Sequence, residues 1–102
     1  MLIYEVNLEV DKEAEQTFIE WLPFHIKQIL VLPGFEKANW FSIESLESSS
    51  DKVLWTVHYW VQNRELLEKY FTDHAPTLRA DGLKRFGGKF KATRRILTEI
   101  TI

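Results

Sequence analysis

The chain has 102 residues, of which 45% are hydrophobic and 27% are charged, and its formal net charge is -2. This length predicts a single domain that spans residues 1–102, and the slightly acidic balance argues against a nucleic-acid backbone as the main partner. The absence of cysteine excludes disulfides and thiolate metal sites and favours a cytoplasmic setting, and no apolar run is long enough to predict a membrane span.

The N-terminal part predicts a strand followed by a helix. Apolar and polar residues alternate with a period of two, which predicts a strand over residues 2–10 with one buried face. Asp11 can cap a helix that extends to the Pro-Gly pair at 33–34. The apolar residues at helical spacing in it are Ala14, Phe18, Trp21, Leu22, Ile26, Ile29 and Leu30. Because Pro23 lacks a backbone N–H, we expect a kink or a break near the middle of this helix unless the proline faces outward.

A pair of strands is predicted next. The mixed strand-like pattern at 35–46 is followed by a polar loop at 47–51, which indicates a hairpin. The segment VLWTVHYWV at 53–61 is rich in β-branched and aromatic residues, so we expect it in the middle of the sheet. Alternation places two sets of side chains on opposite faces, namely Trp55, Val57 and Tyr59 on one and Leu54, Thr56, His58 and Trp60 on the other.

The second helical region contains a bend. Asn63 can cap a helix that reaches Ala75, and Pro76 can start a new helical turn after the bend. The glycine pair at 87–88 ends the helical region, and a last strand follows at 89–100. The resulting β-α-β-β-α-β order predicts an α+β, ferredoxin-like plait, in which a four-stranded antiparallel sheet carries both helices on one face.

The second face of this sheet needs a cover. Because segment 53–61 carries aromatic residues on both faces, and large exposed aromatic patches are uncommon on monomers, we expect a homodimer that packs sheet to sheet. Scattered exposed rings are the alternative. RNA-recognition domains share this topology, but here Glu5 occupies a position that should be apolar, and 53–61 lacks the required basic residue and glycine. No nucleic-acid partner is therefore expected.

Polar side chains at three helical positions form a candidate site. At about 100° per residue, His25 falls near the centre of the apolar arc of the first helix, and Arg79 falls inside the apolar arc that follows Pro76. His74 lies one turn before Arg79. Because arginine grips a carboxylate with two charge-assisted hydrogen bonds, His25, His74 and Arg79 are candidate ligands for a small organic anion. The structural alternatives are a hydrogen-bonded neutral histidine and an arginine paired with a protein carboxylate.

Other chemistry has weaker support in the sequence. The three histidines, His25, His58 and His74, lack the spacing and the carboxylate partners of a metal site, so we expect neither a metal nor a cofactor. The serine run at 48–50 indicates a turn and not a nucleophile.

Three stretches resemble a known family. They are MLIYEVNLEVD at 1–11, His25 with LPGF at 32–35, and HAPTLRADGLKRFGGKFKATRRIL at 74–97, and together they resemble a family of small bacterial proteins catalogued only as a domain of unknown function. That family is similar to the dimeric α+β barrel superfamily, which includes cofactorless monooxygenases. The resemblance implies the fold and a dimer, but a shared fold does not transfer a reaction. The hypotheses are an anion-binding homodimer, a structural or interaction module without a ligand site, and a cofactorless monooxygenase-like enzyme.

Overall fold

The computed structural model describes residues 1–47 and 51–102, so the turn predicted for the serine run at 48–50 lies outside the described residues. In chain order the elements are β1 (Leu2–Asp11), α1 (Glu15–Leu30), β2 (Phe35–Ser42), β3 (Lys52–Val61), α2 (Arg64–Asp73), α3 (Ala75–Phe86) and β4 (Phe90–Thr98). Short 3-10 turns at Lys12–Ala14 and Gly87–Lys89 precede α1 and β4.

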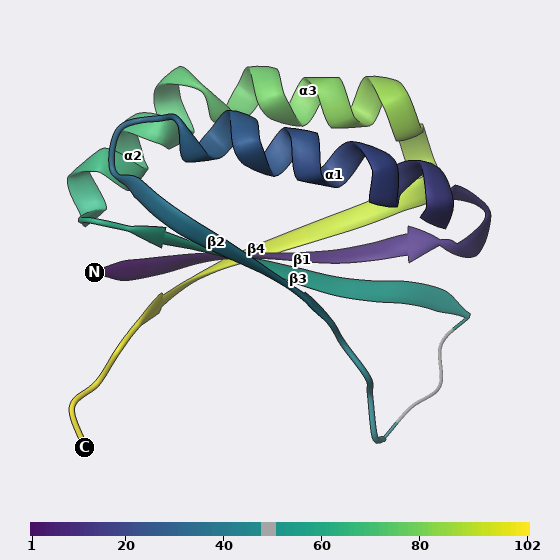
Figure 1. Cartoon of the computed structure of the whole chain (residues 1–102), viewed down its shortest axis with the longest axis horizontal. Helices are drawn as coiled ribbons and strands as arrows, with labels where there is room; N and C mark the ends of the chain where they lie inside the picture. Colours follow the sequence, from purple (N-terminus) through teal and green to yellow (C-terminus); the bar gives the residue numbers. More distant parts are fainter. Residues whose placement is uncertain (48–50) are drawn as a thin grey trace.

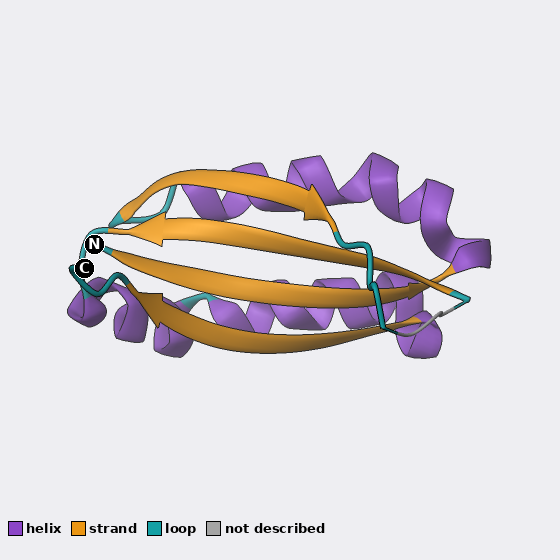
Figure 2. Ribbon diagram, turned by 90° about the horizontal axis from the view of Figure 1, so that it is seen from below, coloured by secondary structure: helices purple, strands orange, loops and turns teal. Residues whose placement is uncertain are grey.

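The strands form one antiparallel, four-stranded sheet in the order β2-β3-β1-β4. The helices cover one face of this sheet, and the other face is turned away from them (Figures 1 and 2). This arrangement confirms the ferredoxin-like plait predicted from the sequence, and it places β3 in the interior of the sheet as expected. None of the described helices is long and apolar enough to cross a membrane.

Some element boundaries differ from the predicted ones. β2 ends at Ser42 instead of residue 46, because the side chains that follow are exposed and bury no apolar face. β4 ends at Thr98 instead of residue 100, since Thr98 lies opposite Leu2, where β1 begins. Asp11 holds the N-cap position of the 3-10 turn at Lys12–Ala14, but its side chain makes no capping hydrogen bond, and the cap residue of α1 itself is Ala14. Asp11 is the last residue of β1, and its carboxylate pairs with Lys52 across the β1–β3 ladder.

Helix α1 continues through Pro23 without the expected break. Proline cannot donate the hydrogen bond to the carbonyl four residues earlier, which costs about 3 kcal/mol in a helix interior. Buried side chains lie on both sides of the proline and offset this cost; they are Phe18, Leu22, Ile26 and Ile29. Packing of the amphipathic face therefore decides the continuity of this helix.

The strand register determines which side chains face the helices. Val6 on β1 lies opposite Val57 on β3 and Arg94 on β4, so these three side chains point to the helix side. Their neighbours Glu5 and Arg95, which lie opposite each other, point to the open face. The core on the helix side includes Tyr4, Leu8, Val10, Phe18, Leu22, Ile29, Tyr59, Val61 and Leu67.

Glu5 lies at the centre of a polar cluster on the open face. Its carboxylate accepts hydrogen bonds from Nε of Arg95 at 2.6 Å and from Nδ2 of Asn7 at 2.8 Å, and it lies 3.0 Å from Nε2 of His58. These neighbours leave Glu5 only 4% exposed. The hydrogen bond from Arg95 is the main cause that lowers the pKa of Glu5 to about 2, so this carboxylate is charged at neutral pH. The sheet face that was expected to be aromatic thus has a charged centre.

Candidate functional site

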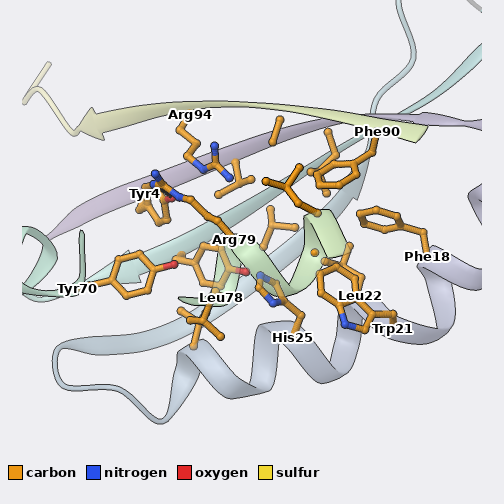
Figure 3. Close-up of a pocket in the computed structure, with 18 residues that line it drawn as sticks. Tyr4, Phe18, Trp21, Leu22, His25, Tyr70, Leu78, Arg79, Phe90 and Arg94 are labelled. Atoms are coloured by element: carbon orange, nitrogen blue, oxygen red, sulfur yellow. Dashed lines mark hydrogen bonds between the residues drawn. The ribbon is translucent and has the colours of Figure 1, made fainter. Parts of the chain in front are cut away.

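A cavity of about 220 Å³ lies between the helices and the sheet (Figure 3). Strands β1, β3 and β4 form one side of it, and helices α1, α2 and α3 form the other. Aromatic side chains make up much of its wall, namely Tyr4, Phe18, Trp21, Tyr59, Tyr70 and Phe90. An apolar hollow with a few polar groups is the usual form of a small-molecule site.

Two arginines line this cavity from opposite layers of the fold. Arg79 projects from α3 and Arg94 from β4, and both also border an adjoining surface depression together with Tyr4. Figure 3 shows both side chains at the Tyr4 end of the cavity. Nη2 of Arg79 donates a hydrogen bond to the hydroxyl of Tyr4 at 3.3 Å, and the guanidinium carbon lies 6.0 Å from the ring centre of Phe71. Both arginines are exposed, so they stand at the mouth of the cavity.

Neither arginine is paired with a carboxylate of the described residues. Within residues 1–47 and 51–102, no Asp or Glu lines the cavity or the adjoining depression, and the Arg94 guanidinium has no hydrogen bond or ion pair. The alternative was that Arg79 pairs with a protein carboxylate, and the described residues provide no such carboxylate. The two positive charges at this opening repel each other, which raises the electrostatic energy of the empty site. An anion bound between them would attract both arginines and offset this repulsion.

His25 lines the same cavity from α1. Its ring stacks on Trp21, with 4.5 Å between the ring centres and 26° between the planes. Burial lowers the pKa of His25 to about 4, so the imidazole is neutral at pH 7. Nδ1 of His25 and Nε1 of Trp21 are buried and have no hydrogen-bond partner among the described residues. Each buried polar atom without a hydrogen bond lowers the stability of the fold by about 1–3 kcal/mol. Two such atoms side by side are unusual in a cavity wall whose role is only structural.

His74 does not line this cavity. It lies between α2 and α3, where its backbone N–H bonds the carbonyl of Tyr70, and it borders two other depressions, both shared with Leu32. Its backbone angles, φ -126° and ψ -37°, mark the bend predicted before Pro76. Of the three candidate residues, the structure brings His25 and Arg79 to one cavity and leaves His74 elsewhere.

The three histidines occupy three different surroundings. His58 lies on the open face beside Glu5, whereas His25 and His74 lie on the helix side. Over the described part of the chain, no three His, Asp or Glu side chains are grouped closely enough to hold a metal ion.

Arg94 lines the cavity but was not among the candidate residues predicted from the sequence. The alternation of β4 places Phe90, Ala92 and Ile96 on the helix side, and Arg94 shares their phase. The sequence does show that Arg94 and Arg95 face opposite ways. Only the register with β1 identifies Arg94 as the one that shares a cavity with Arg79.

Comparison with known proteins identifies a family. The family model described as "Domain of unknown function (DUF4286)" matches residues 1–100, which confirms the resemblance noted in the sequence. A search of curated proteins found no match.

Solved structures share the fold. An ethyl tert-butyl ether D (EthD) family protein from Bacillus halodurans C-125 has a TM-score of 0.71 and 24% identity, over 98% of this chain and 100% of that chain. SnoaB, a cofactor-independent oxygenase from Streptomyces nogalater, has a TM-score of 0.67 and 12% identity, over 99% and 95% of the two chains. The de novo designed protein Foldit4 has a TM-score of 0.62 and 13% identity, over 97% and 98%. These similarities confirm the ferredoxin-like α+β fold. Since a designed protein shares it, the fold by itself assigns no reaction.

Proposed function

The chain belongs to the family described as a domain of unknown function (DUF4286), and from its own cavity we propose that it binds a small organic anion between the helices and the sheet. The observation that carries the proposal is the pair of guanidinium groups, Arg79 and Arg94, at the mouth of an apolar cavity whose described lining holds no carboxylate. Guanidinium groups match the geometry of carboxylates and bind them with charge-assisted hydrogen bonds. The neutral ring of His25 lines the interior and adds no charge there.

The anion site can be tested by thermal shift with a panel of organic acids, quinones and haem. A ligand that binds only the folded state stabilises it by about 2.7 kcal/mol at one hundred times its Kd, which raises the melting temperature. We expect organic acids to raise the melting temperature of the wild type and to have a smaller effect on Arg79→Gln.

Arg85→Gln is the matched control for that experiment. Arg85 lies on the same helix but pairs with Asp81 on the surface and does not line the cavity, so this variant should keep the wild-type shift. If no organic acid stabilises the protein, or if Arg79→Gln and Arg85→Gln respond equally, the anion site is wrong.

We also propose that the protein is a homodimer that packs through the open sheet faces. Figure 2 shows this face without a cover from the helices. One feature of the face supports a partner: Phe41, an aromatic residue, is 47% exposed there. Light scattering at low micromolar concentration should give twice the chain mass of 12.1 kDa, and a particle of the chain mass would contradict the dimer.

We further propose a cytoplasmic setting for the protein, since the sequence has no cysteine.

An oxygenase-like reaction on the bound anion is a second candidate function. It is favoured by the neutral imidazole of His25 in the cavity, since a neutral imidazole can accept a proton. A pKa of about 4 makes His25 a weak base, so binding is the primary proposal. Oxygen uptake after addition of a bound acid, lost in His25→Phe, would support the reaction; binding without oxygen uptake would contradict it.

A further inference from the structure

We infer that the ligand is a single-ring aromatic carboxylate, whose carboxylate lies between Arg79 and Arg94 and whose ring lies against the aromatic wall. This inference rests on the proposed function and names its ligand class. It follows from three features of the cavity: the charge at one end, the aromatic side chains at the other, and the limited space between them.

The charged end fits one carboxylate. Two guanidinium groups approach from opposite layers, and the hydroxyl of Tyr4 lies beside Arg79. A carboxylate has two oxygens that can each accept from one arginine. A phosphate group carries more charge and a third strong acceptor oxygen. The described cavity lining holds no cation besides Arg79 and Arg94, and Arg95, which also borders the adjoining depression, is already paired with Glu5. The site thus matches a carboxylate better than a phosphate.

The opposite end fits a ring. Figure 3 shows Phe18, Trp21 and Phe90 at the end of the cavity away from the two arginines. Phe18 meets both other rings edge to face, with centres 5.3 Å from Trp21 and 5.4 Å from Phe90. Aromatic side chains prefer such offset and edge-to-face contacts with a further ring. An apolar planar body, and not a flexible polar one, is the group that this end favours.

The volume limits the ligand to one ring. At about 220 Å³ the cavity lies below the roughly 300–1,000 Å³ of sites for drug-sized ligands. Part of this space exists because Gly82 on α3 has no side chain. A Cβ atom at Gly82 would lie 3.4 Å from Cη2 of Trp21 and 3.7 Å from Cζ of Phe90, in ordinary contact with both. Alanine at this position is therefore compatible with the fold but takes space from the aromatic end.

Isothermal titration of the full chain with five probes tests the inference: benzoate, cyclohexanecarboxylate, acetate, benzamide and inorganic phosphate. We expect benzoate to bind at least about tenfold more tightly than each of the others, since one charge-assisted hydrogen bond or one well-packed ring contributes about 1.4 kcal/mol or more. Arg94→Gln should weaken benzoate binding at least about tenfold. Arg94→Lys should weaken it less, because lysine keeps the positive charge but lacks the planar pair of N–H donors of the guanidinium group.

Two further variants separate the two ends of the site. Gly82→Ala should weaken benzoate binding at least about fivefold and leave acetate binding unchanged. Lys91→Gln is the matched charge control, because Lys91 lies on β4 with Arg94 but faces the open side, and it should bind benzoate as the wild type does. Circular dichroism of each variant establishes that it is folded.

The outcomes distinguish this inference from the proposed function. If acetate, phosphate or cyclohexanecarboxylate binds as tightly as benzoate and Arg79→Gln weakens that binding, the anion site stands and the aromatic carboxylate is wrong. An equal loss of acetate and benzoate binding in folded Gly82→Ala also overturns the placement of the ring. If none of the probes binds the wild type, both proposals fall.

Discussion

Nη2 of Arg79 on α3 lies 3.3 Å from the hydroxyl oxygen of Tyr4 on β1 and donates a hydrogen bond to it. The ring of Tyr4 is buried and fixed by its neighbours, with centres 5.8 Å from Tyr59 and 5.4 Å from Phe71. A rigid hydroxyl in the sheet therefore holds the end of a long, exposed side chain that comes from the helix layer. This contact orients Arg79 toward the mouth of the cavity.

Removal of this hydroxyl should weaken anion binding through Arg79. For Tyr4→Phe we expect benzoate affinity to fall about threefold to tenfold, since one hydrogen bond contributes about 0.5–1.5 kcal/mol. The ring packing remains, so the melting temperature should change little. In an Arg79→Gln background, Tyr4→Phe should have no further effect on titration with benzoate. Full additivity of the two losses would show that Tyr4 does not act by positioning Arg79.

The burial of His25 should make the protein less stable in mild acid. Its pKa is about 4 in the folded state against 6.5 for the free group, so the unfolded chain binds the extra proton between these values. The full contribution of His25 to stability is present above pH 6.5 and is lost as the pH falls toward 4. Urea unfolding should show a free energy of unfolding about 2 kcal/mol lower at pH 5 than at pH 7.

His25→Phe should remove most of this difference between pH 7 and pH 5. The matched variant His74→Gln should keep it, because His74 does not line the cavity. If the pH dependence survives in His25→Phe, another group causes it.

Glu5 should contribute to stability in a different range of pH. Its pKa of about 2 lies below the ordinary 4.5, so its contribution is present above pH 4.5 and is lost as the pH falls toward 2. Because Arg95 is largely exposed to solvent, we expect only about 2 kcal/mol less free energy of unfolding for Glu5→Gln at pH 7. The difference from the wild type should shrink by pH 2.5. Glu9→Gln, an exposed site on the same face of β1, should have little effect, and equal losses in both variants would contradict a special role for Glu5.

Gly34 should not tolerate a side chain. Its φ is 89°, and a Cβ atom there would lie 2.7 Å from Cβ of Leu66 on α2. Both the backbone conformation and the contact oppose substitution, so Gly34→Ala should lower the free energy of unfolding by about 2 kcal/mol or more. Gly88→Ala is the control, since a Cβ at Gly88 meets no atom within 4 Å and its φ is not positive. Equal thermal stability of the two variants would refute this prediction.

Local pattern alone predicted the order of the elements and the faces of the strands. Alternation placed Val57 and Tyr59 on the same face of β3, and the structure buries both. Asn63 was identified as a helix cap, and its Oδ1 accepts a hydrogen bond from the N–H of Leu66 at 2.9 Å. Such features depend on residues within one or two turns of each other. A period of two or of 3.6 residues is therefore enough to predict them.

Only the tertiary structure decided the composition of the cavity and the continuity of α1. Arg79 and Tyr4 are 75 positions apart in the sequence, and their contact depends on how α3 crosses the sheet. The register of β4 against β1 brought Arg94 to the same mouth, and the bend before α3 left His74 outside it. A helical wheel gives the direction of a side chain around its own axis but not the angle between two elements. That angle is set by the summed packing of many buried side chains, which no local stretch of sequence contains.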